Sequence, residues 1–147
     1  MAVGSAVESF GPDFGRAVAQ AIVQANVTNT ATGTIFDVTV DGVNIHDLTL
    51  DGNNPGTASD PDLAYGVRNV DMSGGATANG LRVSHATLAN FAHGGILAAV
   101  SGGSTGFLFD GNDVSRIGDF LPDGFADAVG IALYGGSGSV QNNGVSF

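Results

Sequence analysis

The chain has 147 residues, with 24 glycines, 4 prolines, no cysteine and no tryptophan, a composition that indicates frequent turns and not an ordinary compact core. Its 14 acidic and 4 basic residues give a net charge of −10, which opposes binding to nucleic acid or to an anionic membrane surface. The absence of cysteine excludes disulfides and thiolate metal sites, and no apolar run is long enough to span a membrane. All acids except Glu8 are aspartate and every basic residue is arginine, so turn formers outnumber helix formers.

Two interpretations are open for residues 1–33. Apolar residues at helical spacing in an alanine-rich stretch, preceded by Pro12, favour a short helix over residues 13–25. The runs 7–10 and 21–24 are instead typical of short strands. We favour strands and loops, so that this segment is irregular or forms a first, incomplete coil of the structure that follows.

From residue 34 a strand continues to Val40 and turns at Asp41 and Gly42 into an eight-residue pattern. The pattern is apolar at its first, third, sixth and eighth positions. It predicts two short strands joined by a two-residue corner, because alternation places every second side chain on one face and the corner resets the phase. Four copies occupy residues 43–50, 81–88, 107–114 and 140–147.

A second recurring feature lies between the copies. Short apolar segments begin at Tyr65, Gly94 and Val129, and each is followed by a turn rich in glycine and serine that leads into the next copy. One coil therefore consists of three short strands with glycine-rich corners. Coils stacked about 4.8 Å apart would pair each strand in parallel with its equivalent, and would align equivalent residues in ladders along the axis.

This arrangement over residues 34–147 resembles the right-handed parallel β-helix proteins of the pectate-lyase-like superfamily, which are secreted and surface proteins of bacteria. The resemblance implies an all-β solenoid of about four to five coils and a secreted or cell-surface location, with the signal sequence outside this chain. Members of the superfamily range from polysaccharide lyases, hydrolases and epimerases to adhesins and stalks without catalytic activity. Because the fourth copy ends at Phe147, we expect a fragment of a longer β-helix.

The ladders predict the core. Inward-facing side chains are expected at the first, third and eighth positions of the copies: Val43, Leu81, Phe107 and Val140; Ile45, Val83 and Phe109; Leu50, Leu88, Val114 and Phe147. Asn112 and Asn142 occupy inward positions that are apolar in the other copies. A buried amide there must bond to the backbone or to another amide, since an unpaired one costs a few kcal/mol.

The loops that follow the copies are unequal and predict a groove. Residues 51–65 and 115–129 form long loops, whereas residues 89–94 form a short one, and all three leave the same corner of the coil. The short loop would form the floor with Asn90, Phe91 and His93. The long loops would form the walls with Asp60, Asp62 and Tyr65 on one side and Arg116, Asp119, Phe120, Asp123, Phe125 and Asp127 on the other.

Aromatic rings, carboxylates and an imidazole in one cleft suit a sugar or a metal ion. The candidate catalytic residues are His93, Asp123, Asp127 and Arg116. The candidate ligand-binding residues are Asp60, Asp62, Tyr65, Phe91, Phe120 and Phe125. The alternative is that these acidic loops are solvated turns.

A second candidate lies at the corner inside the repeat, where Asp47 and His85 should be neighbours on adjacent coils. A carboxylate beside an imidazole orients it for proton transfer or shares a metal ion with it. The alternative is a surface pair that contributes less than about 1 kcal/mol.

Motifs of known activities are incomplete. Residues 92–94 resemble the Gly-His-Gly of polygalacturonases but lack the paired aspartates, and residues 59–62 resemble the Asp-Pro-His of mannuronan epimerases but lack its histidine. Two hypotheses follow. The first is a non-catalytic β-helix segment of an exported or cell-surface protein, a structural or adhesive scaffold. The second is a carbohydrate-active enzyme, a polysaccharide lyase, hydrolase or epimerase with its groove around His93.

The expected partners follow from these hypotheses. They are a polysaccharide or cell-surface component, further coils of the parent chain, and a second copy bound through the open ends. The candidate cofactor is Ca²⁺, because it would bridge an acidic polysaccharide to an acidic chain. Neither nucleic acid nor membrane insertion is expected.

Overall fold

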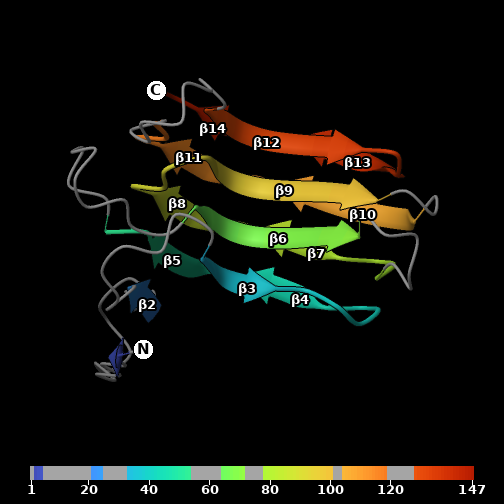
Figure 1. The fold of residues 1–147 in the computed structure, drawn as a ribbon, viewed down its shortest axis with the longest axis horizontal. Helices are drawn as coiled ribbons and strands as arrows, with labels where there is room; N and C mark the ends of the chain where they lie inside the picture. Colours follow the sequence, from blue (N-terminus) through green and yellow to red (C-terminus); the bar gives the residue numbers. More distant parts are fainter. Residues whose placement is uncertain are drawn as a thin grey trace, which may run out of the picture.

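The computed structural model describes residues 2–4, 21–24, 33–53, 64–71, 78–100, 104–118 and 128–147, and every regular element in these ranges is a β-strand (Figure 1). The strands are β1 (Ala2–Gly4), β2 (Ala21–Gln24), β3 (Thr34–Asp37), β4 (Asn44–His46), β5 (Leu48–Asp51), β6 (Tyr65–Asp71), β7 (Arg82–Ser84), β8 (Thr87–Ala89), β9 (Gly94–Val100), β10 (Thr105–Asp110), β11 (Asp113–Ser115), β12 (Val129–Tyr134), β13 (Ser137–Gln141) and β14 (Gly144–Val145).

Three sheets run along the molecule. Sheet A has the order β1-β2-β5-β8-β11-β14, sheet B has β12-β9-β6-β3 and sheet C has β13-β10-β7-β4. From β2 onward every pairing is parallel, and each coil contributes one strand to each sheet. The chain is therefore a parallel β-helix of about four coils, as the repeat predicts, and Figure 1 shows these coils stacked from the N-terminal to the C-terminal end.

The segment before the first full coil contains two described strands. Residues 21–24 form β2, which pairs in parallel with β5, so the strand interpretation of these residues is confirmed and the helix over 13–25 is wrong there. β1 pairs with β2 in the antiparallel direction and ends sheet A. The strand expected at residues 7–10 and the rest of the predicted helix lie outside the described residues.

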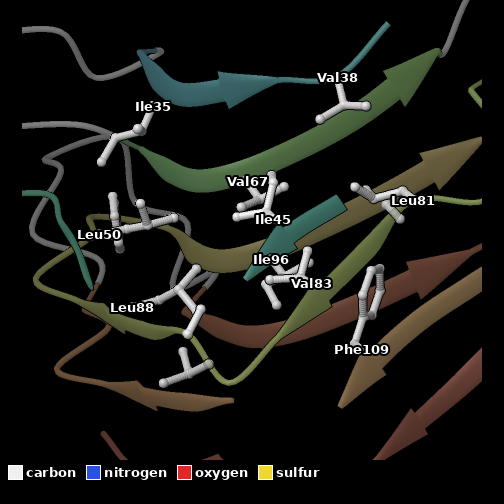
Figure 2. Packing of buried hydrophobic residues seen from close by; sticks show 14 of the residues in the cluster. Ile35, Val38, Ile45, Leu50, Val67, Leu81, Val83, Leu88, Ile96 and Phe109 are labelled. Carbon is white, nitrogen blue, oxygen red and sulfur yellow. The ribbon is translucent and has the colours of Figure 1, made fainter. Parts of the chain in front are cut away.

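The inner ladders agree with the prediction in the first three copies. Ile45, Val83 and Phe109 are in register along sheet C. Leu50, Leu88 and Val114 are in register along sheet A. Figure 2 shows the side chains of Leu50 and Leu88 side by side in the core.

In the fourth copy the predicted register is wrong by two residues. Val140 pairs with Phe109, and Gly138 pairs with Phe107, so glycine occupies the first position. The eighth position is Val145, which pairs with Val114, whereas Phe147 is 76% exposed. The error has a simple cause. A spacing of five residues separates both the first from the sixth position and the third from the eighth, so the pair 140 and 145 fits either register.

Glycine is required where sheets A and B approach each other inside the coil. Gly66, Gly95 and Gly130 occupy equivalent positions on β6, β9 and β12, one residue after the in-register partners Tyr65, Gly94 and Val129. A Cβ atom on Gly95 would lie 2.5 Å from Cγ1 of Val114 and 2.8 Å from the carbonyl oxygen of Gly130. The missing side chain therefore leaves room for the valine and leucine ladder of sheet A.

The corner inside each copy has a left-handed backbone. The fifth positions Asp47, His85, Gly111 and Asn142 have φ angles between 50° and 65°. Asparagine, aspartate, histidine and glycine are the residues that adopt this conformation most readily. The polar residues at this corner are therefore suited to it because their backbone adopts the left-handed conformation that the turn requires.

Candidate functional site

The structure brings together Tyr65 and His93, both members of the predicted groove. Their rings stack with centroids 5.8 Å apart and planes inclined by 26°, and both residues are partly buried. Tyr65 is in register with Gly94, whose Cβ atom would lie only 3.0 Å from the tyrosine ring, so glycine leaves room for that ring. The backbone N–H of His93 donates to the carbonyl of Ala64 at 2.9 Å, which joins the backbone of His93 to the neighbouring coil.

Phe91 does not line a groove. Its side chain is fully buried and belongs to the hydrophobic core. The ring extends toward two glycines of the neighbouring coil, since a Cβ atom on Gly52 or on Gly66 would lie 2.6 Å or 3.1 Å from it. The assignment of Phe91 as a ligand-binding residue is wrong, because glycine on the facing strands gives the ring a place inside the coil.

Asn90 and Arg116 lie above one another at the corner that follows β8 and β11. Ala89 and Ser115 are in register, and the N–H of Asn90 donates to the carbonyl of Ser115 at 3.4 Å. Both have left-handed φ angles, 61° for Asn90 and 51° for Arg116, and Arg116 is exposed. The other predicted wall residues lie outside the described residues: Asp60, Asp62, Asp119, Phe120, Asp123, Phe125 and Asp127.

Asp47 and His85 are neighbours along the axis, as predicted, but their side chains have other contacts. The N–H of Asp47 bonds to the carbonyl of Ser84 at 3.2 Å, and its carboxylate lies 2.9 Å from Nδ1 of His46 on the same coil. The imidazole of His85 lies over Gly111, 3.0 Å from where a Cβ atom would be. Within the described ranges no three histidine or acidic residues gather as a metal site.

The buried amide of Asn112 connects three coils. Its Nδ2 donates to the carbonyl of Val83 and its Oδ1 accepts from the N–H of Ala86, at 2.9 Å and 3.1 Å. Asn143 repeats these bonds one coil later: its Nδ2 donates to the carbonyl of Phe109, and its Oδ1 accepts from the backbone N–H and from Nδ2 of Asn112, all at 2.9 Å. The expectation that the buried amide of Asn112 bonds to backbone and to another amide is confirmed.

Asn142 does not face the core, contrary to the prediction. It is exposed, and its Nδ2 donates to Oδ1 of Asp110 at 2.9 Å. The register shift of two residues accounts for this error, because it moves Asn143 to the inward sixth position and Asn142 to the left-handed corner.

Exposed and partly buried polar side chains also bridge neighbouring coils. Asn79 accepts from the N–H of Thr105 at 3.0 Å, and its own N–H donates to the carboxylate of Asp41 at 2.6 Å. Asn90 donates from Nδ2 to Oδ1 of Asp51 at 2.8 Å. These bonds run along the axis, so they reinforce the stacking that the backbone ladders provide.

Arg68 on β6 makes two hydrogen bonds to a single carboxylate. Its Nε and one Nη donate to the two carboxylate oxygens of Asp37 on β3, at 3.2 Å and 2.8 Å. This hydrogen bonding to Asp37 raises the pKa of the Arg68 guanidinium above its ordinary value. Sequence reasoning did not select this pair. The parallel register of β3 and β6, which aligns Asp37 with Arg68, is the signal that would have found it.

In comparisons with protein families, curated proteins and solved structures, the chain gave no match. No helix in the described part of the chain has the length and apolar character of a membrane span.

Proposed function

We propose that the chain is a non-catalytic segment of an exported or cell-surface protein, in which stacked coils serve as a structural or adhesive scaffold of the pectate-lyase-like type. The supporting observation is that polar side chains make hydrogen bonds between neighbouring coils. Carboxylates and amides that could bind a ligand instead make hydrogen bonds to neighbouring coils. They belong to Asp37, Asp41, Asn79 and Asn112. Side chains bonded in this way hold the coils together and keep the surface of the sheets regular.

A rod of stacked coils suits a scaffold for a physical reason. Each coil contacts its neighbours through three short parallel pairings, and axial hydrogen bonds add to them at the corners. The free energy of unfolding therefore accumulates with each added coil. The net charge of −10 would keep such a rod soluble and would favour partners that are neutral or bring cations.

A second candidate function is favoured by one contact, the stacked Tyr65 and His93 rings. A tyrosine ring offers an apolar face to a sugar, and an imidazole beside it can accept or donate a proton. This candidate is a lyase, hydrolase or epimerase acting on a polysaccharide in a groove around His93.

One experiment separates the two functions. The purified chain is incubated with a panel of neutral and acidic polysaccharides, with and without Ca²⁺, and both product release and binding are measured. The scaffold function predicts no product with any polysaccharide, and fractionation of producing cells should place the protein at the surface or in the medium.

His93→Ala and His46→Ala are matched variants for this assay, because each removes one imidazole and only His93 stacks on Tyr65. Product formation that is lost in His93→Ala and retained in His46→Ala would establish the carbohydrate-active function and exclude the non-catalytic one.

A further inference from the structure

The outer face of sheet B carries a partly exposed aromatic ring. Successive residues of a strand point to opposite faces of its sheet. Gly66 on β6 faces the core, because a Cβ atom there would lie 2.8 Å from Cδ2 of Leu88 on sheet A. Tyr65, the residue before it, therefore faces outward on the sheet that β3, β6, β9 and β12 form (Figure 1).

An ion pair lies on the same outer face. Val67 and Asn69, on either side of Arg68, are buried, whereas the side chains of Arg68 and Asp37 are 31% and 49% exposed. Hydrogen bonding to Asp37 is the main cause of the raised pKa of Arg68, and Tyr65 contributes to it, so the tyrosine lies within electrostatic reach of the guanidinium. The ring and the ion pair form one surface about 10 Å long, since they lie three residues apart on the strand.

Both parts of this surface are held in place by the fold. The Tyr65 ring stacks on His93 with centroids 5.8 Å apart, and two hydrogen bonds hold the guanidinium of Arg68 against the carboxylate of Asp37. Side chains that are already ordered lose little conformational entropy when a ligand binds. The surface is therefore preorganised.

A ring beside a guanidinium and a carboxylate matches the chemistry of a sugar. The C–H face of a sugar ring packs on an aromatic side chain, and each hydroxyl can both donate and accept a hydrogen bond. The bonds between Arg68 and Asp37 use two of the five N–H donors of the guanidinium. Further donors and carboxylate lone pairs are left for hydroxyl groups.

Charge selects the class of sugar. Arg68 is the only basic residue in the described strands of sheet B, and Asp37 neutralises it. The chain as a whole has a net charge of −10. A uronate or a sulfated sugar would find no uncompensated arginine in these strands and would be repelled by the chain. A neutral sugar meets no such repulsion.

We propose that the surface formed by Tyr65, His93, Arg68 and Asp37 binds a neutral polysaccharide. The polysaccharide packs on the exposed part of the tyrosine ring, and its hydroxyls form hydrogen bonds with the ion pair. The proposal rests on the scaffold function given above, and it names the component to which an adhesive scaffold attaches. Binding alone is involved, so no bond of the sugar is broken.

Isothermal titration calorimetry of the whole chain tests the proposal. The probes are neutral hexasaccharides of glucose, mannose and xylose, with hexagalacturonic acid as the acidic probe, all without Ca²⁺. At least one neutral probe should bind, and Tyr65→Ala should raise its dissociation constant about tenfold or more. Tyr65→Phe keeps the ring and should stay within about threefold of the unchanged chain. Tyr134→Ala is the matched control, because Tyr134 on β12 is 59% exposed and lies outside the proposed surface.

Asp37→Asn tests the charge argument. This variant leaves Arg68 without its carboxylate partner and keeps a side chain of the same size. Hexagalacturonic acid should then bind about fivefold more tightly or better, because a carboxylate of the sugar can replace that of Asp37. Asp113→Asn is the control, since it makes the same change of net charge at an exposed residue of β11 on sheet A and should have no such effect.

The proposal is supported if a neutral hexasaccharide binds, Tyr65→Ala weakens it and Tyr134→Ala does not. It is overturned if no neutral probe binds, if both tyrosine variants weaken binding equally, or if the unchanged chain prefers the acidic probe. An Asp37→Asn variant that gains no affinity for the acidic probe, or gains no more than Asp113→Asn, also overturns it.

Failure of the proposal is distinguishable from failure of the scaffold function. Absence of sugar binding leaves a purely structural scaffold in place. Release of product from a bound sugar would overturn the non-catalytic function and leave the binding surface standing. Circular dichroism tests whether Tyr65→Ala folds, and the Asp37→Asn measurement decides the proposal if it does not.

Discussion

At the scale of single residues, the buried amide of Asn112 makes hydrogen bonds to both neighbouring coils, and its removal should lower the stability of the fold. Asn112→Ala would leave the carbonyl of Val83 and the N–H of Ala86 without their bonds in the buried corner. We expect the variant to lower the free energy of unfolding by about 3 kcal/mol. Urea unfolding followed by circular dichroism measures this loss.

Asn142→Gly is the control for Asn112. It removes one exposed hydrogen bond to Asp110 and keeps a residue suited to the left-handed φ of 56°. Its expected cost is below about 1 kcal/mol. Equal losses in the two variants would show that the buried amide has no special role.

Gly95 is required for the close approach of sheets A and B. In Gly95→Ala the added methyl would overlap Val114 and the backbone of Gly130, and backbone cannot move aside as a flexible side chain can. We expect a loss of about 2 kcal/mol, again measured by urea unfolding. In Gly144→Ala the nearest contact, Oδ1 of Asp113, lies 3.9 Å away, so the change should be smaller than about 0.5 kcal/mol. A loss in Gly144→Ala as large as in Gly95→Ala would contradict the steric explanation.

At the scale of elements, the pair of Arg68 and Asp37 connects β3 to β6. Both side chains are partly exposed, at 31% and 49%, so Arg68→Ala should cost less than about 1 kcal/mol. The folded-state pKa of Arg68 is raised, which means that its contribution is present at pH below the ordinary arginine pKa and is lost only as the pH rises through the raised value. The cost of Arg68→Ala should therefore be the same at about pH 7 and about pH 9.

Thermal or urea unfolding of the Arg68→Ala variant at both pH values measures this pH dependence. Arg82→Ala, at an exposed arginine on β7, is the control for general loss of positive charge. A cost for Arg68→Ala that disappears between the two pH values would show that another titrating group governs the contact.

At the scale of the whole molecule, charge repulsion opposes the compact state. With 14 acidic and 4 basic residues, added NaCl should raise the free energy of unfolding by screening. The urea midpoint measured at increasing NaCl checks this. CaCl₂ at matched ionic strength is the comparison, because stabilisation beyond that of NaCl would indicate bound Ca²⁺ and not screening alone.

The sequence by itself determined the architecture of the coil. Alternating apolar residues and the phase reset at each corner are local patterns, and they identified the inner ladders of the first three copies, Ile45 with Val83 and Leu50 with Leu88 among them. The inward position of Asn112 followed from the same pattern. Such features depend on residues close together in the chain, so a repeat reveals them.

Only the tertiary structure decided what depends on contacts between coils. Phe91 is buried because glycines of the neighbouring coil leave room for its ring, and local sequence carries no sign of that room. Tyr65 and His93 were both predicted groove residues, yet their stacking depends on coil-to-coil register. The register of the last copy was decided in the same way, because one spacing of apolar residues fits two alignments, and the pairing of Val140 with Phe109 and of Val145 with Val114 selects one of them.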